Sequence, residues 1–213
     1  FPDQALLITA SDGRITHFLE KPTWGEVLSD TVNTGIYILE PEVLDLVPAG
    51  EEFDFSKNLF PALLELGEPL YGYTAEGYWC DIGNPLQYLQ ANQDALQGRL
   101  KVKIPGRETN GVWVGEGAEI EDYVEIKEPA LIGSKARIRE KTSIGSFSVI
   151  GNGATLDEKA SAKRSVVWNN TVVGSRADLV GCVVGEKCTI RDSAIILEGA
   201  VVGDECIVGR GST

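Results

Sequence analysis

Apolar side chains recur at every sixth position through the second half of the chain, from about residue 111 onward. Two steps of five residues interrupt the series, one after Ala162 and one after Leu179. These anchor positions are Val114, Ile120, Ile126, Ile132, Ile138, Ile144, Ile150, Leu156, Ala162, Val167, Val173, Leu179, Val184, Ile190, Ile196, Val202 and Val208. The period fits neither an α-helix, with roughly 3.6 residues per turn, nor the alternation of a simple hairpin.

The spacing predicts short strands joined by tight corners, with three strands in each triangular coil. Successive coils stack at the strand spacing of about 4.8 Å, so each anchor should pack on the anchor about 18 residues away. The residue four positions after an anchor is small in most repeats, as at Ala136 and Ala154. We expect the glycines that directly follow anchors to allow sharp backbone turns. They are Gly115, Gly133, Gly145, Gly151, Gly174, Gly185, Gly203 and Gly209.

The residues ahead of the repeats alternate between strand-like and helix-like patterns, which predicts an α/β region. We expect strands at residues 14–20, 32–39, 71–75 and 78–82, the last two paired, and helices at residues 59–66 and 85–96. Ser56 is the expected N-cap of the first helix, and Gly67 marks its end. Asn84 is the expected N-cap of the second helix, and Gly98 lies just beyond its end.

Residues 99–110 follow neither pattern, so we predict that they link two domains. The first domain comprises residues 1–98, which are too few for a complete nucleotide-binding sheet. The second domain comprises residues 111–213 and contains the repeats.

The chain is acidic, with 19 Lys and Arg against 32 Asp and Glu and a formal net charge of −13. Long-range repulsion from phosphate backbones and anionic lipids makes nucleic acid and membranes poor partners. No apolar run approaches the about 18 residues of a spanning helix, and no signal peptide is recognisable. The four cysteines form no C-x-x-C pair and there is one histidine, which disfavours a zinc site. We therefore expect a reduced, cytoplasmic protein.

Four segments of the first half carry a family resemblance. They read FLEKP at residues 18–22, VNTGIY at residues 32–37, FDFSKNLFP at residues 53–61 and GYWCDIG at residues 77–83. In order and spacing they resemble the sugar-nucleotide pyrophosphorylases, and most closely the mannose-1-phosphate guanylyltransferases, which also carry a β-helix after the catalytic domain. The resemblance implies a partial α/β nucleotidyltransferase domain followed by a left-handed parallel β-helix of hexapeptide repeats.

The reaction implied by this resemblance is nucleotidyl transfer, in which a sugar 1-phosphate attacks the α-phosphorus of a nucleoside triphosphate and pyrophosphate leaves. The expected substrates are GTP and mannose 1-phosphate, giving GDP-mannose, with uridylyl, thymidylyl and adenylyl transfer to glucose 1-phosphate as related reactions. By resemblance, Glu20 accepts hydrogen bonds from sugar hydroxyls, Lys21 contacts the sugar phosphate, and Asn33 and Gly35 line the sugar pocket. Asp81 is the implied ligand of Mg²⁺, which prefers oxygen. We also expect a homo-oligomer assembled through the β-helix.

Two parts of the family pattern are missing from this sequence, namely the glycine-rich loop that cradles the triphosphate and the second metal-binding aspartate. We therefore expect no catalysis by this chain alone, and a non-catalytic regulatory or oligomerisation subunit stays open as an alternative. Acyl transfer is another alternative, because hexapeptide β-helices often build acetyl-CoA sites between subunits. Those enzymes usually rely on a histidine base, and residues 111–213 contain no histidine, which weakens this alternative.

Overall fold

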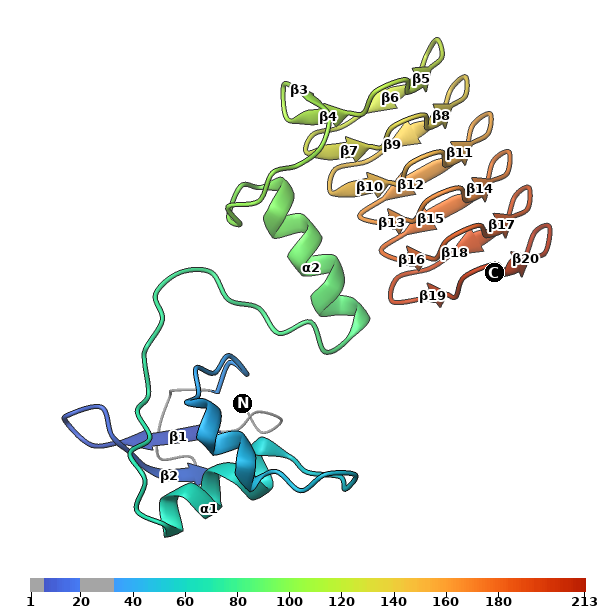
Figure 1. Ribbon diagram of the computed structural model, residues 1–213. Helices are drawn as coiled ribbons and strands as arrows, with labels where there is room; N and C mark the ends of the chain where they lie inside the picture. The colour runs from blue at the N-terminus through green and yellow to red at the C-terminus, as the bar shows by residue number, and fades with distance from the viewer. Residues whose placement is uncertain (1–5, 20–32) are drawn as a thin grey trace. The chain divides into compact units, whose positions relative to one another are not determined.

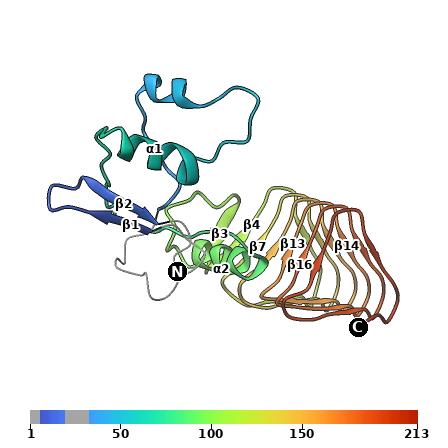
Figure 2. The same cartoon turned by 90° about the horizontal axis from the view of Figure 1, so that it is seen from below.

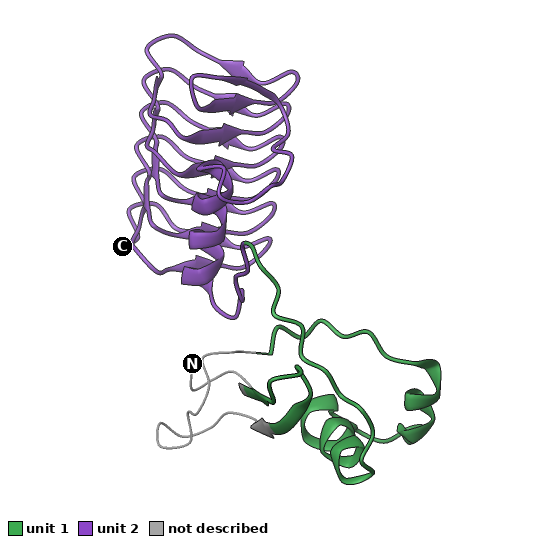
Figure 3. Cartoon of the chain, turned by 90° about the vertical axis from the view of Figure 1, so that its left-hand side faces the viewer, with its two compact units in different colours: residues 1–77 green, residues 78–213 purple. Residues whose placement is uncertain are grey.

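The computed structural model describes residues 6–19 and 33–213 (Figure 1). It forms two compact units, Phe1–Gly77 and Tyr78–Thr213 (Figure 3). The domain limits predicted from the sequence stay a prediction. In the described ranges, no helix has both the length and the apolar character needed to cross a membrane.

The first unit begins with two antiparallel strands, β1 (Leu6–Thr9) and β2 (Ile15–Leu19). In the turn between them, Oδ1 of Asp12 accepts a hydrogen bond of 3.0 Å from the backbone N–H of Arg14. The strand predicted at residues 14–20 is thus confirmed from Ile15 to Leu19.

The described residues of this unit also contain three short helical segments: the 3₁₀ helix η2 (Pro41–Leu46), the π-helical turn η3 (Phe55–Leu59) and the helix α1 (Phe60–Glu65). Leu59, Phe60 and Leu63 are buried and form a small hydrophobic core. Half-buried neighbours, including Leu39 and Phe53, pack against that core. The helix predicted at residues 59–66 therefore exists, and it is the element around which the unit packs.

The N-cap expected at Ser56 is wrong, because the cap is Asp54. Its carboxylate accepts hydrogen bonds from the backbone N–H groups of Ser56 at 2.7 Å and Lys57 at 3.0 Å. Asp54 has the extended backbone that an N-cap requires, whereas Ser56 already lies inside the helical turn. At the other end, Gly67 adopts a left-handed φ of +74° and ends the helix as predicted.

The strands expected over residues 32–39, 71–75 and 78–82 are wrong for every described residue of these ranges. Only an isolated bridge between Arg14 and Tyr71 forms there. The alternating apolar residues face water instead, since Ile38 is 100% exposed and Tyr73 is 92% exposed. A strand needs a neighbour to pair with, and apart from residues 13–15, which pair only with residues 70–72, the described residues place none beside these segments.

The second unit is a parallel β-solenoid with one sheet on each of three faces (Figures 1 and 2). Sheet I contains β4 (Val112–Val114), β7 (Ala130–Ile132), β10 (Ser148–Ile150), β13 (Val166–Val167), β16 (Val183–Val184) and β19 (Val201–Val202), with β3 (Arg107–Thr109) antiparallel to β4. Sheet II contains β5 (Glu119–Ile120), β8 (Arg137–Ile138), β11 (Thr155–Leu156), β14 (Val172–Val173), β17 (Thr189–Ile190) and β20 (Ile207–Val208). Sheet III contains β6 (Glu125–Ile126), β9 (Ser143–Ile144), β12 (Ser161–Lys163), β15 (Asp178–Val180) and β18 (Ile195–Ile196).

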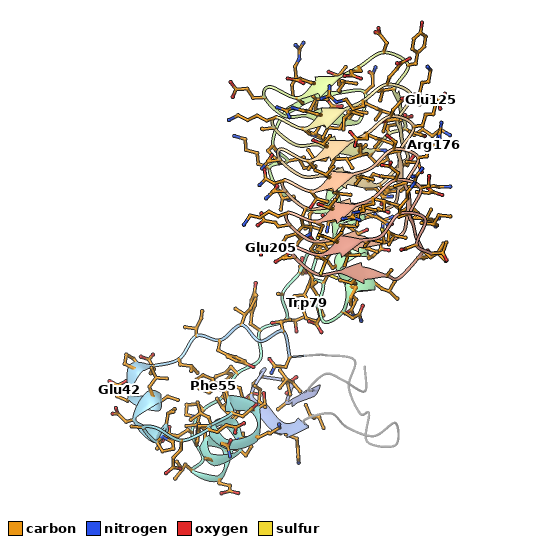
Figure 4. The ribbon with its side chains drawn as sticks, turned by 90° about the vertical axis from the view of Figure 1, so that its right-hand side faces the viewer. Glu42, Phe55, Trp79, Glu125, Arg176 and Glu205 are labelled. Atoms are coloured by element: carbon orange, nitrogen blue, oxygen red, sulfur yellow. The ribbon has the colours of Figure 1, made fainter. Side chains whose placement is uncertain are left out.

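The anchor positions stack in register, and those from Ile132 to Ile190 fill the interior of the solenoid, whereas Ile120 in the first coil is 41% exposed. Ile132 pairs with Ile150, 18 residues on, and Ile150 pairs with Val167, 17 residues on. The step of 17 is the predicted five-residue interruption, which shortens a coil without moving its anchor to the outer side. Ile132 and Ile150 are fully buried, so the predicted inward assignment is confirmed. Charged side chains such as Glu125 and Arg176 point away from the coils (Figure 4).

Six of the eight glycines that follow anchors, all except Gly203 and Gly209, are needed for a different reason from the one expected. Gly133 and Gly151 have no left-handed φ, whereas Lys135, Lys141 and other residues with side chains occupy the left-handed corners. A Cβ atom at Gly133 would lie 2.6 Å from the backbone N of Asn152, and one at Gly151 would lie 2.6 Å from the carbonyl carbon of Trp168. Close stacking of the next coil, rather than a sharp turn, therefore requires glycine.

Helix α2 (Pro85–Leu96) packs against the outer surface of sheet I (Figure 2). Its cap is confirmed, because Oδ1 of Asn84 accepts a hydrogen bond of 2.9 Å from the backbone N–H of Gln87. Leu89 lies in a buried cluster with Val166 and Val183. Sheet I can hold this helix because its strands are apolar on both sides, unlike most strands of sheets II and III.

Candidate functional site

Residues 33–37, the described part of the segment VNTGIY, form a tight turn that is held by Asn33. Oδ1 of Asn33 accepts a hydrogen bond of 3.0 Å from the backbone N–H of Gly35, and Nδ2 of Asn33 donates one of 2.7 Å to the hydroxyl of Tyr37. Gly35 has a φ of +75°, and a Cβ atom there would meet nothing within 4 Å. An amide has two donors and two lone pairs, so within the described residues these two hydrogen bonds leave Asn33 one N–H and one lone pair. The sequence thus builds a fixed polar turn beside open space.

Tyr37 connects this turn to the core of the first unit. Its ring lies 4.9 Å from the ring of Phe60, at an interplanar angle of 72°, and 6.1 Å from the ring of Phe55. Edge-to-face contacts of this kind add stability beyond simple burial. The segment FDFSKNLFP, which supplies both phenylalanines, therefore supports the segment that carries Asn33.

Asp81 lies on a segment that is tied to α2 at both ends. The hydroxyl of Tyr78 donates a hydrogen bond of 2.8 Å to Oδ2 of Asp94, and the backbone N–H of Gly83 donates one of 3.0 Å to Oε1 of Gln87. Asp81 itself is exposed. Since α2 packs on sheet I, the segment GYWCDIG is supported by the solenoid.

Asp94 is the centre of this attachment, and only 6% of its surface is exposed. Its Oδ1 accepts hydrogen bonds from Nε2 of Gln90 at 2.9 Å and from a guanidinium nitrogen of Arg99 at 3.0 Å. The hydrogen bond from Tyr78, followed by those from Gln90 and Arg99, lowers the pKa of Asp94. The hydrogen bond to Asp94 also raises the pKa of Tyr78 well above its usual range. The carboxylate therefore stays ionised and holds the cluster together at neutral pH.

We expect Asp94→Asn to destabilise the chain by about 1–3 kcal/mol at neutral pH, because hydrogen bonds to a buried charge are lost. The folded-state pKa lies below the unfolded value of about 3.9, so the stabilisation is complete above that value and is lost as the pH falls through the folded-state pKa. Thermal melting followed by circular dichroism at a series of pH values measures both effects. The exposed Asp122 provides the control, Asp122→Asn, which should melt like the wild type. Equal melting of Asp94→Asn and wild type at neutral pH would contradict the assignment.

Sequence reasoning placed five residues in the site, and the structure describes three of them. Glu20 and Lys21 lie outside the described residues. Asn33 and Gly35 share one turn in the first unit, whereas Asp81 belongs to the second unit. Their convergence on one pocket stays a prediction.

Magnesium binding by Asp81 also stays a prediction. Across residues 6–19 and 33–213, no group of three or more His, Cys, Asp or Glu side chains is arranged to hold a metal ion. A single exposed carboxylate nevertheless fits Mg²⁺, which usually keeps several waters and binds proteins through one or two carboxylates together with substrate phosphates.

Three supporting residues escaped the sequence analysis. Gln87 follows the N-cap Asn84 by three residues, which is the spacing of a capping box and could have indicated its role. The spacing of four residues between Gln90 and Asp94 on α2 was a weaker signal for Asp94. The bond from Tyr78 to Asp94 and the ring contact of Tyr37 with Phe60 gave none, because packing brings these partners together.

Comparisons with known proteins divide the chain into two parts. Residues 6–98 match the family model described as "Nucleotidyl transferase", and residues 109–213 match the model described as "EIF2B subunit epsilon LbH domain". The second match is to a left-handed β-helix domain, with which the parallel solenoid is consistent. The fold class predicted from the sequence, a partial nucleotidyltransferase region followed by a left-handed parallel β-helix, is therefore confirmed.

Curated relatives have several nucleotide specificities. A UTP–glucose-1-phosphate uridylyltransferase of Synechocystis sp. is 37% identical over 195 residues, which are 90% of this chain and 50% of that protein. A mannose-1-phosphate guanylyltransferase of Mycobacterium tuberculosis is 35% identical over 91 residues, 42% of this chain and 25% of that protein. A glucose-1-phosphate adenylyltransferase of Desulfitobacterium hafniense is 38% identical over 98 residues, 43% of this chain and 24% of that protein. The chain spans half the length of the first relative and less of the others, and it combines a nucleotidyltransferase-family domain at residues 6–98 with a hexapeptide β-helix domain at residues 109–213.

Proposed function

We propose that this chain supplies the sugar side and the β-helix of an enzyme that transfers a nucleotidyl group from a nucleoside triphosphate to a sugar 1-phosphate. A phosphate oxygen of the sugar attacks the α-phosphorus, the bond from that phosphorus to the β-phosphate oxygen breaks, and pyrophosphate leaves. The observation that carries this proposal is the fixed turn of Asn33 and Gly35, which lies inside the region that matches the nucleotidyltransferase family.

The residues of this chain act by positioning in this proposal. The free N–H and lone pair of Asn33 bind one sugar hydroxyl, and Gly35 lets the sugar approach the backbone. Glu20 accepts hydrogen bonds from other hydroxyls, and the ammonium of Lys21 pairs with the sugar phosphate. Asp81 is the proposed Mg²⁺ ligand, and bound Mg²⁺ neutralises charge on the phosphates. Held geometry of this kind is the main contribution a protein makes to phosphoryl transfer.

The substrate pair proposed first is GTP with mannose 1-phosphate, giving GDP-mannose. Its support is the resemblance of the four segments and the similarity to guanylyltransferases of Mycobacterium tuberculosis and Arabidopsis thaliana. A second candidate pair, UTP with glucose 1-phosphate, is favoured by the uridylyltransferase relative, which matches 90% of this chain.

The chain is proposed to need a triphosphate-binding segment that its own sequence does not contain. Support comes from the missing glycine-rich loop and from relatives of which the chain spans half or less. The proposed setting is the cytoplasm, where the free thiols of all four cysteines would persist. Assembly of identical subunits through the β-helix is part of the same proposal. A regulatory subunit built on this fold is the alternative.

A pyrophosphate-release assay tests the proposal. The chain alone, and the chain together with a family-type triphosphate-binding segment, are each given Mg²⁺ and every pairing of GTP, UTP, ATP and dTTP with mannose 1-phosphate or glucose 1-phosphate. We expect release only from the longer protein, and fastest with GTP and mannose 1-phosphate. Fastest release with UTP and glucose 1-phosphate would select the second candidate. Release with no pair, from a folded longer protein, would favour the regulatory alternative.

A further inference from the structure

A hollow of about 720 Å³ lies where the β3–β4 hairpin meets the first coils of the solenoid. Among the residues that line it are Lys103, Arg107, Thr109, Glu116 and Ser134. All of them belong to the second unit. Ligand pockets commonly measure about 300–1,000 Å³, so the hollow is large enough for a small metabolite.

The backbone that carries Arg107 is fixed against the solenoid. Strand β3 pairs with β4 in a register that sets Arg107 opposite Val114. The preceding residue, Gly106, has a φ of +100°, and a Cβ atom there would lie 2.7 Å from the carbonyl oxygen of Val114. This close approach holds the backbone at Gly106 and Arg107 against the first coil. The edge of the hollow that these residues form is therefore fixed in position.

The lining offers donors that have no partner of their own. Within the described part of the chain, neither Lys103 nor Arg107 forms an ion pair, although seven ion pairs form elsewhere. The hydroxyls of Thr109 and Ser134 likewise form no hydrogen bond with any residue that the structure describes. Glu116 supplies the one carboxylate of the lining. The hollow thus gathers two cations and two hydroxyls in a chain whose formal net charge is −13.

We propose that this hollow binds a phosphorylated small molecule, with a phosphoryl group held between Arg107 and Lys103. The planar guanidinium of arginine can hold two phosphate oxygens at once, and lysine adds a mobile point charge. The hydroxyls of Thr109 and Ser134 donate to the remaining oxygens, and Glu116 lies where a hydroxyl on the organic part of the ligand can donate to it. This site does not depend on the function proposed above, because it uses none of the residues assigned to that reaction.

Isothermal titration calorimetry of the full chain tests the site. Inorganic phosphate, pyrophosphate and glucose 1-phosphate serve as probes, at low ionic strength and with a chelator present so that no divalent cation bridges the anions to carboxylates. We expect one site per chain and tighter binding of pyrophosphate than of phosphate. Arg107→Ala and Lys103→Ala should each weaken binding about tenfold, the loss of one charge-assisted contact, and Arg107→Lys should weaken it less than Arg107→Ala.

Lys163→Ala is the matched control, because Lys163 is an exposed lysine of β12 and lies outside the hollow. It changes the net charge as Lys103→Ala does and should leave binding unchanged. Equal weakening by both lysine variants would mean attraction by net charge alone and would overturn the proposal. So would wild-type affinity in the Lys103 and Arg107 variants, or no measurable binding to the wild type. Melting curves confirm that each variant is folded before titration, and a glutamine variant at the same position (Lys103→Gln, Arg107→Gln or Lys163→Gln) replaces any alanine variant that is not.

Discussion

Leu156→Asp is expected to abolish the cooperative unfolding of the solenoid, whereas Thr155→Asp on the same strand leaves its melting temperature nearly unchanged. Leu156 is fully buried, and its neighbours in register, Ile138 and Val173, are apolar. A carboxylate placed there has no cation to pair with. Burying such a charge costs several kcal/mol, a large share of the about 5–15 kcal/mol by which a domain is stable.

Thr155 is a suitable control position for Leu156, because it is the adjacent residue on the same strand and is only half-buried. In the register of sheet II it lies beside Arg137, so an aspartate at residue 155 gains a favourable neighbour. Thermal melting of both variants by circular dichroism measures the difference. Equal melting temperatures would contradict the assignment of Leu156 to the interior.

Asp81→Asn should lower turnover about a hundredfold or more in the pyrophosphate-release assay described above, with the triphosphate-binding segment present. The amide is nearly the same size as the carboxylate but lacks the charge that attracts Mg²⁺. We expect the melting temperature to stay unchanged, because Asp81 is exposed and makes no side-chain hydrogen bond within the described residues. The loss should thus appear in activity alone.

The exposed Asp122 again provides the matched control, since Asp122→Asn removes one carboxylate from the first coil. That variant should keep full turnover. A dependence of rate on Mg²⁺ concentration, measured for both variants, shows whether the metal is involved. Unchanged turnover of Asp81→Asn would refute the metal assignment while leaving the family membership intact.

The solenoid could be predicted in detail because its pattern is local and repeated. Each anchor lies at the spacing that its neighbours predict. The inward residues and the two coils shortened by a five-residue step therefore follow from the periodicity. The purpose of Gly151 did not follow, because a single coil gives no indication of how closely the next one approaches. The cap at Asn84 was predictable for the same reason as the anchors, since its partner lies three residues away.

The first unit was less predictable because its segments depend on distant partners. Residues 33–39 have the alternation of a strand, yet a strand forms only beside another, and the described residues supply none. Asn33 and Gly35 share one turn, and their role in the sugar pocket stays a prediction. The support of that turn by Tyr37 and Phe60 arises from ring packing that no motif spacing reveals.

The cover that α2 provides for sheet I has a consequence for the autonomy of the repeats. Without α2, the outward side chains of Val149, Val166 and Val183 would form a water-facing hydrocarbon strip along the prism. Strips of that kind drive self-association. A shortened chain that starts at the first hexapeptide repeat would therefore aggregate. The smallest solenoid that stays in solution includes α2.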